Sequence, residues 1–299
     1  MQEAGDLIAA GELVAFPTET VYGLGGDALD PEASKKIYSA KGRPSDNPLI
    51  VHISDFSDLE RIAKTVPEDA RKLSDAFWPG PLTMIVEKGD AVPYATTGGM
   101  DTVAVRMPNH PIALDLIRRS GCLIAAPSAN LSGKPSPTRA ADVIEDLKGK
   151  VDAIIEGPDC RVGIESTVLD VSGETPTILR PGIITPESIE AAIGKKVAVD
   201  PALYINRPRD VNSEEFKPKS PGMKYRHYAP KAPVTVVRGD PQDTAKYIAE
   251  HIGNSTGVLC FDEYREMFPT CVVECFGSQD DLGAQAREVF DRLRAFDDT

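Results

Sequence analysis

Two clusters of basic and polar side chains have the residue types needed to bind a small anionic ligand. In the first, Lys41 and Arg43 flank Gly42, and Asn47 and His52 follow shortly after them. Arginine can form forked hydrogen bonds with phosphate, and lysine neutralises phosphate as a point charge. A lysine at a helix end often only complements the helix dipole, but Arg43 directly after the glycine adds more polarity than capping requires. The cluster is a candidate phosphate site, with a simple helix terminus as the alternative.

The second cluster lies on two predicted strands. Arg106 is inside the apolar segment TVAVRMP, which begins with Thr102. A buried guanidinium needs an anionic partner, because an unpaired buried charge is costly. Ser128 and Asn130 follow the strand CLIAAPS two residues apart, so their hydroxyl and amide point the same way. The continuation NLSGKPSPT is typical of a loop that closes over a ligand.

The segment PTETVYGLGG (17–26) has threonines, a glutamate and a tyrosine that can surround a polar ligand, and an ordinary strand-to-loop exit is the alternative. Gly23, Gly25 and Ala28 also match a dinucleotide fingerprint. That fingerprint requires the first glycine to follow the strand directly and the last position to open the helix. Here the helix is predicted to begin only near Pro31, so the pattern gives little support to an NAD site.

Three further segments are rich in polar residues: GIESTVLD (163–170), LRPG (179–182) and SPGMKYRHYAP (220–230). The last one contains two tyrosines, a histidine and two cations, whereas linkers that only separate domains are usually plainer. We interpret it as a lid that carries functional side chains. A serine hydrolase is disfavoured because Ser128 lacks a GxSxG turn, and the four scattered histidines do not indicate a zinc site.

Alternating strand-like and helix-like segments must position these side chains. GELVAFP is predicted to be a strand. DPEASKKIYSAKG is predicted to be a helix with Asp30 as N-cap, Pro31 at its first position and Gly42 after its end. Further predicted strands are PLIVHIS, PLTMIVEK, TVAVRMP, CLIAAPS and VDAIIEG, and STVLDVSGETPTILRPG is predicted to form a hairpin. Several connections are too short for crossover helices, so the sequence predicts a mixed α/β sheet.

The chain of 299 residues exceeds the usual size of one domain. We predict a catalytic α/β domain over residues 1–197, a linker or lid over 198–232, and a small α/β domain over 233–299. In the last part, PVTVVRG, TGVLCF and TCVVECF have the composition of strands and are separated by helical segments. That alternation is typical of a parallel sheet.

The composition favours a cytoplasmic protein that handles a small ligand. Apolar residues make up 41% of the chain, and neither a signal-peptide pattern nor an apolar run of roughly 20 residues is present. Five cysteines without a CxxC pair indicate reduced thiols. The net charge is −13, yet residues 207–238 contain eight basic and three acidic residues. A short basic stretch of this kind suits a small anion better than a nucleic acid, so no stable tRNA binding is expected.

Six motifs, in this order, resemble the threonylcarbamoyl-AMP synthase family in its long type, which has a YrdC-like catalytic domain and a small C-terminal domain. The motifs are PTETVYGLG, KGRP with NPLIVHI, PSANLSGKPSPT, VGIESTVLD, LRPG and SPGMKYRHYAP. The resemblance implies a twisted mixed sheet followed by a linker and a small parallel, Rossmann-like α/β domain. It also implies synthesis of L-threonylcarbamoyladenylate from L-threonine, bicarbonate and ATP, with Mg²⁺ accompanying ATP and pyrophosphate released.

The resemblance also implies roles for individual residues. The expected catalytic residues are Lys41, Arg43, Ser128 and Asn130. Threonine is expected to contact Thr20, His52, Arg106, Ala126 and Ser166. ATP is expected to contact Arg43, Asn47, Thr102, Ser128, Ser136, Arg180 and Tyr228, together with Lys41 and Asn130. No side chain is expected to bind a metal, and the product is expected to pass to a complex that modifies tRNA next to the anticodon.

Two departures and three alternatives accompany this interpretation. Gly26 and Asp27 stand where the family usually has a small uncharged residue and an asparagine. The chain ends at AREVFDRLRAFDDT, where family members continue for another strand and helix, so a truncated C-terminal domain is expected. The alternatives are an RNA-binding YrdC-like module, a carbamoyltransferase and an NAD oxidoreductase. A carbamoyltransferase should carry acylphosphatase-like and zinc-finger-like segments, and the sequence has neither.

Overall fold

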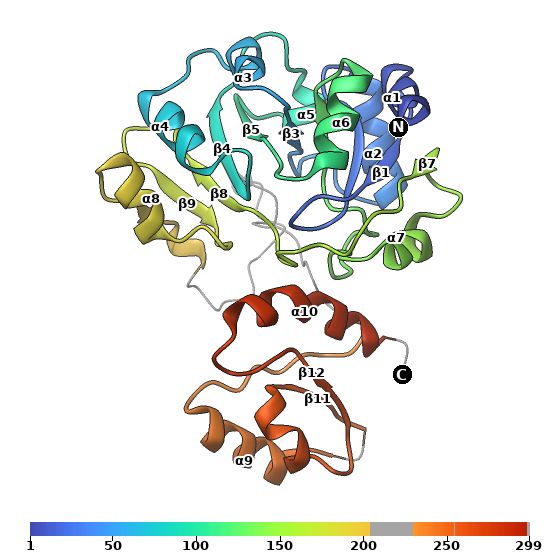
Figure 1. Cartoon of the computed structure of the whole chain (residues 1–299), viewed down its shortest axis with the longest axis vertical. Helices are drawn as coiled ribbons and strands as arrows, with labels where there is room; N and C mark the ends of the chain where they lie inside the picture. The colour runs from blue at the N-terminus through green and yellow to red at the C-terminus, as the bar shows by residue number, and fades with distance from the viewer. Residues whose placement is uncertain (204–229, 254, 298–299) are drawn as a thin grey trace.

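The computed structural model describes residues 1–203, 230–253 and 255–297. Within them, a larger unit contains a mixed sheet and a smaller unit contains a two-stranded sheet (Figure 1). Nearly all of the predicted lid SPGMKYRHYAP, including Tyr228, lies outside the described residues. The expectations for that segment therefore stay predictions.

The described strands of the larger unit form one ten-stranded sheet in the order β10-β9-β8-β4-β5-β3-β6-β2-β1-β7. The pairs β1–β7, β3–β5, β4–β8 and β9–β10 are parallel, and the other neighbouring pairs are antiparallel. The mixed sheet that the short connections predicted is thus confirmed. The strands are β1 (Val14–Phe16), β2 (Gly23–Asp27), β3 (Ile50–His52), β4 (Leu82–Glu87), β5 (Thr102–Arg106), β6 (Ile124–Ala125), β7 (Ala153–Ile154), β8 (Thr167–Asp170), β9 (Thr177–Arg180) and β10 (Ala198–Val199).

Helices cover this sheet, with α1 packed against α6 and α4 against α8. They are α1 (Gln2–Ala9), α2 (Pro31–Lys41), α3 (Phe56–Ile62), α4 (Glu68–Phe77), α5 (Tyr94–Thr97), α6 (Pro111–Ser120), α7 (Ala140–Leu147) and α8 (Pro186–Ile193), followed by the short 3₁₀ helix η1 (Pro201–Leu203). The predicted capping of α2 is confirmed. The Asp30 carboxylate accepts a hydrogen bond from the Glu32 backbone N–H, and Gly42 ends the helix in the left-handed conformation at φ 61°.

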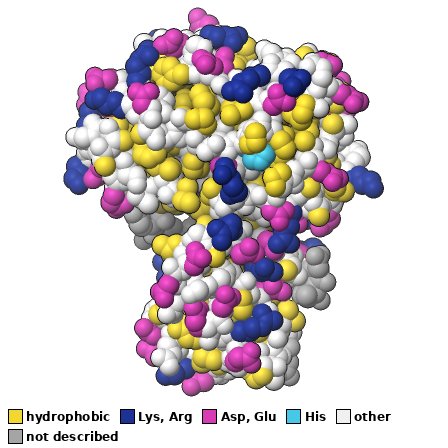
Figure 2. All heavy atoms as spheres, viewed as in Figure 1, with side chains coloured by type: hydrophobic (Ala, Val, Ile, Leu, Met, Phe, Trp, Pro, Cys, Tyr) yellow, Lys and Arg dark blue, Asp and Glu magenta, His cyan; other side chains and the backbone are white. Residues whose placement is uncertain are grey.

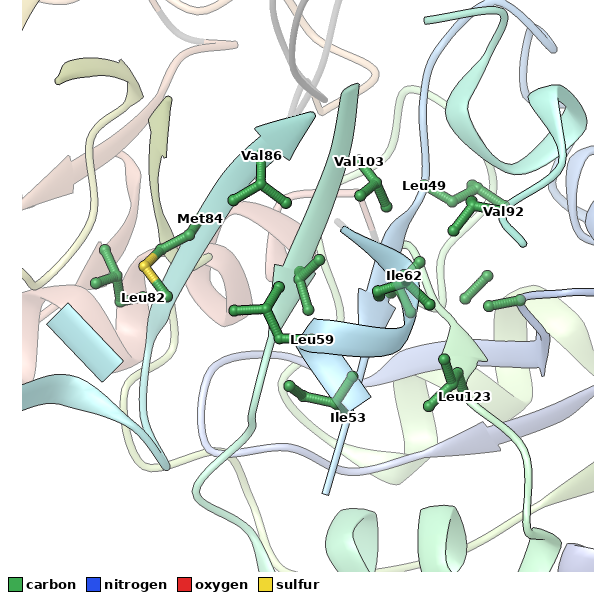
Figure 3. Close-up of a cluster of buried hydrophobic side chains, with 14 of the residues drawn as sticks. Leu49, Ile53, Leu59, Ile62, Leu82, Met84, Val86, Val92, Val103 and Leu123 are labelled. Carbon is green, nitrogen blue, oxygen red and sulfur yellow. The ribbon is translucent and has the colours of Figure 1, made fainter. Parts of the chain in front are cut away.

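Apolar side chains pack on both faces of the sheet. Alternate residues of a strand point to opposite faces, and in β1 Ala15 joins the main core while Val14 and Phe16 join a second cluster with α1 and α6. Figure 3 shows part of the main core, where Met84 of β4 and Leu59 of α3 are among the buried side chains. Burial on both faces leaves the edge formed by the strand ends as the place for polar groups.

Strand β2 was not predicted, because its sequence GLGGD has the composition of a turn. The structure shows why glycine is needed there. A Cβ atom on Gly25 would lie 2.7 Å from Cγ2 of Ile124 and 2.8 Å from Cε1 of Phe16. The glycines therefore allow neighbouring side chains to pack against the strand backbone.

The smaller unit pairs β11 (Gly257–Cys260) with β12 (Val272–Cys275) in parallel, with α9 (Pro241–His251), the 3₁₀ helix η2 (Asp262–Met267) and α10 (Leu282–Ala295) around them. The parallel pairing agrees with the sequence-based expectation. The predicted strand PVTVVRG is wrong, since residues 233–238 have no strand structure. Val234 and Val236 are 57% and 72% exposed there. Their alternating pattern indicates a strand only when a partner edge exists, and none of the described strands supplies one.

Helix α10 lies on the side of the smaller unit that faces the larger one (Figure 1). On the face drawn in Figure 2, acidic and basic side chains mix where the two units meet. Among the described helices, none combines the length and the apolar character needed to cross a membrane.

Candidate active site

A pocket opens at the strand ends of the larger unit. It lies where β3 and β5 end, beside the segment after β6, the loop from β1 to β2 and the segment before β8. The parallel register places His52 of β3 opposite Arg106 of β5, and Gly23 forms a bridge with Ser128. The pocket is lined by Thr18, Thr20, Val21, Tyr22, Gly23, Arg43, Ile50, His52, Arg106, Ala126, Pro127, Ser128, Glu165, Ser166 and Arg180.

Arg106 has the anionic partner that its buried position requires. Its Nη2 lies 2.7 Å from Oε1 of Glu19, and the two side chains are only 4% and 3% exposed. Nη1 donates to Oγ1 of Thr20 at 2.9 Å, and Nε donates to the carbonyl of Gly80 at 3.3 Å. Burial raises the pKa of Glu19, but the Arg106 charge and smaller contacts outweigh it and bring the pKa below its usual value. Glu19 therefore holds the guanidinium as a charged partner.

His52 is neutral in this environment. Burial, followed by the nearby charge of Arg106, lowers the pKa of His52 to about 3. Its Nδ1 lies 3.1 Å from the carbonyl oxygen of Ile50. A carbonyl can only accept, so this contact requires the tautomer that carries the proton on Nδ1, in which Nε2 can accept.

Arg43 and Lys41 occupy different positions although they are two residues apart. Arg43 lines the pocket, and its Nε and Nη2 donate to the carbonyls of Asn47 and Pro48 at 3.2 and 3.1 Å. Lys41 is buried beneath the segment after β6, and its Nζ donates to the backbone carbonyls of Ser128 and Asn130. Burial, with a smaller effect of the Arg43 charge, lowers the pKa of Lys41 well below the usual lysine value. Lys41 thus supports the loop after β6 through its backbone carbonyls and does not line the pocket itself.

The loop after β6 is held by its own side chains. Oγ of Ser128 donates to Oδ1 of Asn130 at 2.6 Å. The Asn130 amide donates to the carbonyls of Leu131 and Lys134 at 2.7 and 2.9 Å. The hydroxyl of Ser128 therefore lies at the pocket, while Asn130 fixes the turn behind it.

The opposite wall carries the residues expected from GIESTVLD and LRPG. Nε and Nη2 of Arg180 donate to the carbonyl and the hydroxyl of Ser166, each at 3.0 Å. The Ser166 hydroxyl also lies 2.7 Å from that of Thr83. The hydroxyl of Ser136 donates to the Glu165 carboxylate, which joins the loop after β6 to the segment before β8.

The structure brings eight of the predicted site residues to one pocket: Thr20, Arg43, His52, Arg106, Ala126, Ser128, Ser166 and Arg180. Five others do not line it: Lys41, Asn47, Thr102, Asn130 and Ser136. Thr102 begins β5, at the end of that strand opposite to Arg106. Sequence reasoning noted Glu19 only as one polar residue of the segment 17–26, and it did not single out Glu165. Both glutamates lie in apolar or hydroxyl-rich segments, and this position could have identified them. A carboxylate that is buried in such a segment needs a polar or charged partner.

The importance of Lys41 for stability gives a first prediction. Replacing Lys41 with methionine leaves two buried carbonyls without their donor, and each such group costs about 1–3 kcal/mol. We expect the free energy of unfolding to fall by about 2 kcal/mol or more, measured by chemical denaturation. Lys36→Met is the matched control on the same helix. Lys36 is exposed and pairs with Glu12, so its loss should change stability by less than about 1 kcal/mol. Equal effects of the two substitutions would contradict the supporting role of Lys41.

The fold and the pocket define an α/β protein with a pocket lined by three arginines, a side chain suited to carboxylate and phosphate groups. Two family models agree with this class: residues 6–182 match the model described as telomere recombination (Sua5, YciO and YrdC), and residues 184–299 match the C-terminal domain of threonylcarbamoyl-AMP synthase. The chain belongs to the threonylcarbamoyl-AMP synthase family.

Individual relatives show how far this similarity extends. The threonylcarbamoyl-AMP synthase of Bacillus subtilis is 49% identical, with 99% of this chain and 84% of the relative covered. That of Pyrococcus abyssi is also 49% identical, with 99% and 85% covered. The crystal structure of P. abyssi Sua5 complexed with L-threonine has a TM-score of 0.91 and 48% identity, and the match covers 100% of this chain and 85% of that one. The similarity therefore includes both units.

Proposed function

We propose that this chain synthesises L-threonylcarbamoyladenylate from L-threonine, bicarbonate and ATP and releases pyrophosphate. The observation that carries the proposal is the buried Arg106, fixed by Glu19 and Thr20 at a pocket that also contains Arg43 and Arg180. One site thus offers a guanidinium for an amino-acid carboxylate and separate cations for phosphates. Full-length similarity to relatives named for this reaction, one of them solved with L-threonine, supports it.

The threonine subsite is proposed to lie at the ends of β3 and β5. Arg106 and the hydroxyl of Thr20 would bind the carboxylate. Neutral His52 would accept a hydrogen bond at Nε2 from the ammonium or the hydroxyl of threonine. The Ala126 backbone and the hydroxyl of Ser166 would complete the contacts. These five residues are buried, which strengthens each polar contact.

The ATP subsite is proposed to lie between Arg43, Ser128, Ser136 and Arg180. ATP carries about four negative charges, and enzymes that transfer such groups act mainly by positioning and neutralising them. The nitrogen of the threonine amine first bonds to the carbon of bicarbonate, a C–O bond breaks and water leaves, which gives the carbamate. A carbamate oxygen then bonds to the α-phosphorus while the bond to the departing pyrophosphate breaks. This route needs no protein nucleophile.

Mg²⁺ is proposed to enter with ATP. The described residues contain no group of three or more His, Cys, Asp or Glu side chains that could bind a metal, so the phosphates would supply most of its ligands. When bound, the ion would neutralise charge on the phosphates. Arg43 and Arg180 would neutralise the charge that remains.

The reaction gives a direct prediction. Pyrophosphate release should require L-threonine, bicarbonate and ATP together, and mass spectrometry should identify the adenylate as the product. Assays that omit one substrate at a time, with bicarbonate removed by degassing, test this. Release that continues at an equal rate without threonine would rule out the proposed reaction.

The RNA-binding alternative is tested separately. A net charge of −13 disfavours a face that displaces counterions from tRNA. A tRNA titration at several salt concentrations should therefore show no tight binding. We propose that the product passes to a separate tRNA-modifying complex and that the reaction takes place in the cytoplasm, where ATP and tRNA are found together.

A further inference from the structure

A side chain of the smaller unit reaches into the loop that follows β6. Arg294 of α10 is only 7% exposed. Its Nη2 donates to the carbonyl of Pro135 at 2.7 Å and to Oδ2 of Asp146 at 2.9 Å. Asp146 also accepts hydrogen bonds from the Leu131 backbone and from Nζ of Lys134. Helix α10 and helix α7 thus hold the loop jointly, through a fully buried carboxylate.

The same helix also contacts the segment on the opposite wall of the pocket. Gly163 has φ +81°, and a Cβ atom there would lie 2.3 Å from Cα of Arg287 and 2.5 Å from the carbonyl oxygen of Ala286. The backbone of α10 therefore packs directly against this segment. The Gly163 N–H donates to the carbonyl of Thr20 at 3.1 Å, so the contact continues to the β1–β2 loop.

These two contacts lie behind one hydrogen bond at the pocket. Ser136, next to Pro135, donates to Glu165, which is two residues after Gly163. Helix α10 supports the loops on both sides of this bond. A third link is the ion pair between Arg139 and Asp291 of α10, at 2.9 Å. Helix α10 therefore contacts the chain close to both partners of the Ser136–Glu165 hydrogen bond, which packing of two units against each other does not by itself require.

We propose that α10 is part of the nucleotide-binding architecture and that Arg294 is a positioning residue that fixes the loop from Ser128 to Ser136 for ATP. This inference rests on the proposed function, because it concerns the ATP subsite of the same reaction. Arg294 acts through the backbone of Pro135 and through Asp146. Without it, the loop keeps its anchor at Lys41 on one side and loses its anchor next to Ser136 on the other.

The test compares Arg294→Met with the matched control Arg292→Met. Arg292 is on the same helix, and its ion pairs with Glu274, Glu288 and the neighbouring Asp291 are all within its own unit. For Arg294→Met we expect the KM for ATP to rise about tenfold, because small displacements of a positioned group cost large factors. The KM for threonine should stay within about twofold, since Arg294 does not reach the threonine subsite. Arg292→Met should leave both values unchanged.

A conservative variant and a binding measurement separate positioning from folding. Both contacts of Arg294 come from one nitrogen, so Arg294→Lys should restore most of the ATP affinity. Asp146 keeps Lys134 as a partner in each variant, and Arg294→Gln, which stays polar but is shorter than arginine, is used if Arg294→Met does not fold. Calorimetry with a non-hydrolysable ATP analogue reports binding without turnover.

The outcomes are distinct. A selective loss of ATP affinity that Arg294→Lys reverses supports the proposal. Equal losses for ATP and threonine, or no change in either, overturn it. Failure of the wild-type protein to form product overturns the proposed reaction instead, and the binding comparison still decides the role of Arg294.

Discussion

Replacing Arg43 with alanine should lower turnover about 100-fold or more, while the loss of its hydrogen bonds to two partly buried carbonyls should lower the free energy of unfolding by about 1–2 kcal/mol without unfolding the protein. Arg43 is at the pocket wall, where the carbonyls of Asn47 and Pro48 hold its guanidinium in place. A charge fixed in advance stabilises the phosphates of the transition state without reorganisation. Rates of pyrophosphate release and chemical denaturation of the same samples measure the two quantities.

Two further variants sharpen this prediction. Arg43→Lys keeps the positive charge but loses the forked hydrogen bonds of the guanidinium. Its rate of pyrophosphate release should therefore lie between those of the wild type and Arg43→Ala. Arg61→Ala is the surface control, because Arg61 is exposed and forms an ion pair with Asp58 on its own helix. A near-normal rate for Arg43→Ala would show that the segment Lys41-Gly42-Arg43 serves only as a helix terminus.

The second large effect should come from Arg106. Loss of its guanidinium should weaken threonine binding by about 2–5 kcal/mol, which is roughly 30-fold to several thousand-fold. ATP affinity should change far less. Calorimetry with each ligand alone gives the comparison.

The structure shows that a single substitution would confuse this experiment. Arg106→Ala leaves the Glu19 carboxylate buried without its partner, which typically destabilises a fold by about 3–5 kcal/mol. The informative variant is therefore Arg106→Met combined with Glu19→Gln. Glu19→Gln alone is the control, and it should keep most of the threonine affinity because the guanidinium remains. Unchanged threonine affinity in the double variant would show that Arg106 serves only to pair with Glu19.

Local signals predicted much of this fold. The cap of α2, the β8–β9 hairpin and the parallel β11–β12 pair each depend on nearby residues, and the structure confirms them. Strand β2 was missed, because its glycines are explained only by Ile124 and Phe16, which are distant in the sequence or on another strand. The strand predicted at residues 233–238 was wrong for the opposite reason. The local sequence has the pattern of a strand, but none of the described strands pairs with it.

The site was predictable by residue type and much less by geometry. The need of buried Arg106 for an anion was clear from the sequence, but its partner Glu19 lies far from it in the sequence, on the loop between β1 and β2. The neutral state of His52 follows from complete burial beside Arg106, which no motif reveals. Lys41 and Arg43 share a motif, yet the end of α2 turns one beneath the loop and the other toward the pocket.

The contact of α10 with the pocket loops also bears on how this protein can be divided for experiment. A fragment that ends after β10 would lack Arg294, expose Asp146 and uncover Gly163, so its pocket would differ from that of the whole chain. Loss of activity in such a truncation would not identify the linker as the cause. The role of each part of this chain is therefore better assigned by point substitution in the intact chain.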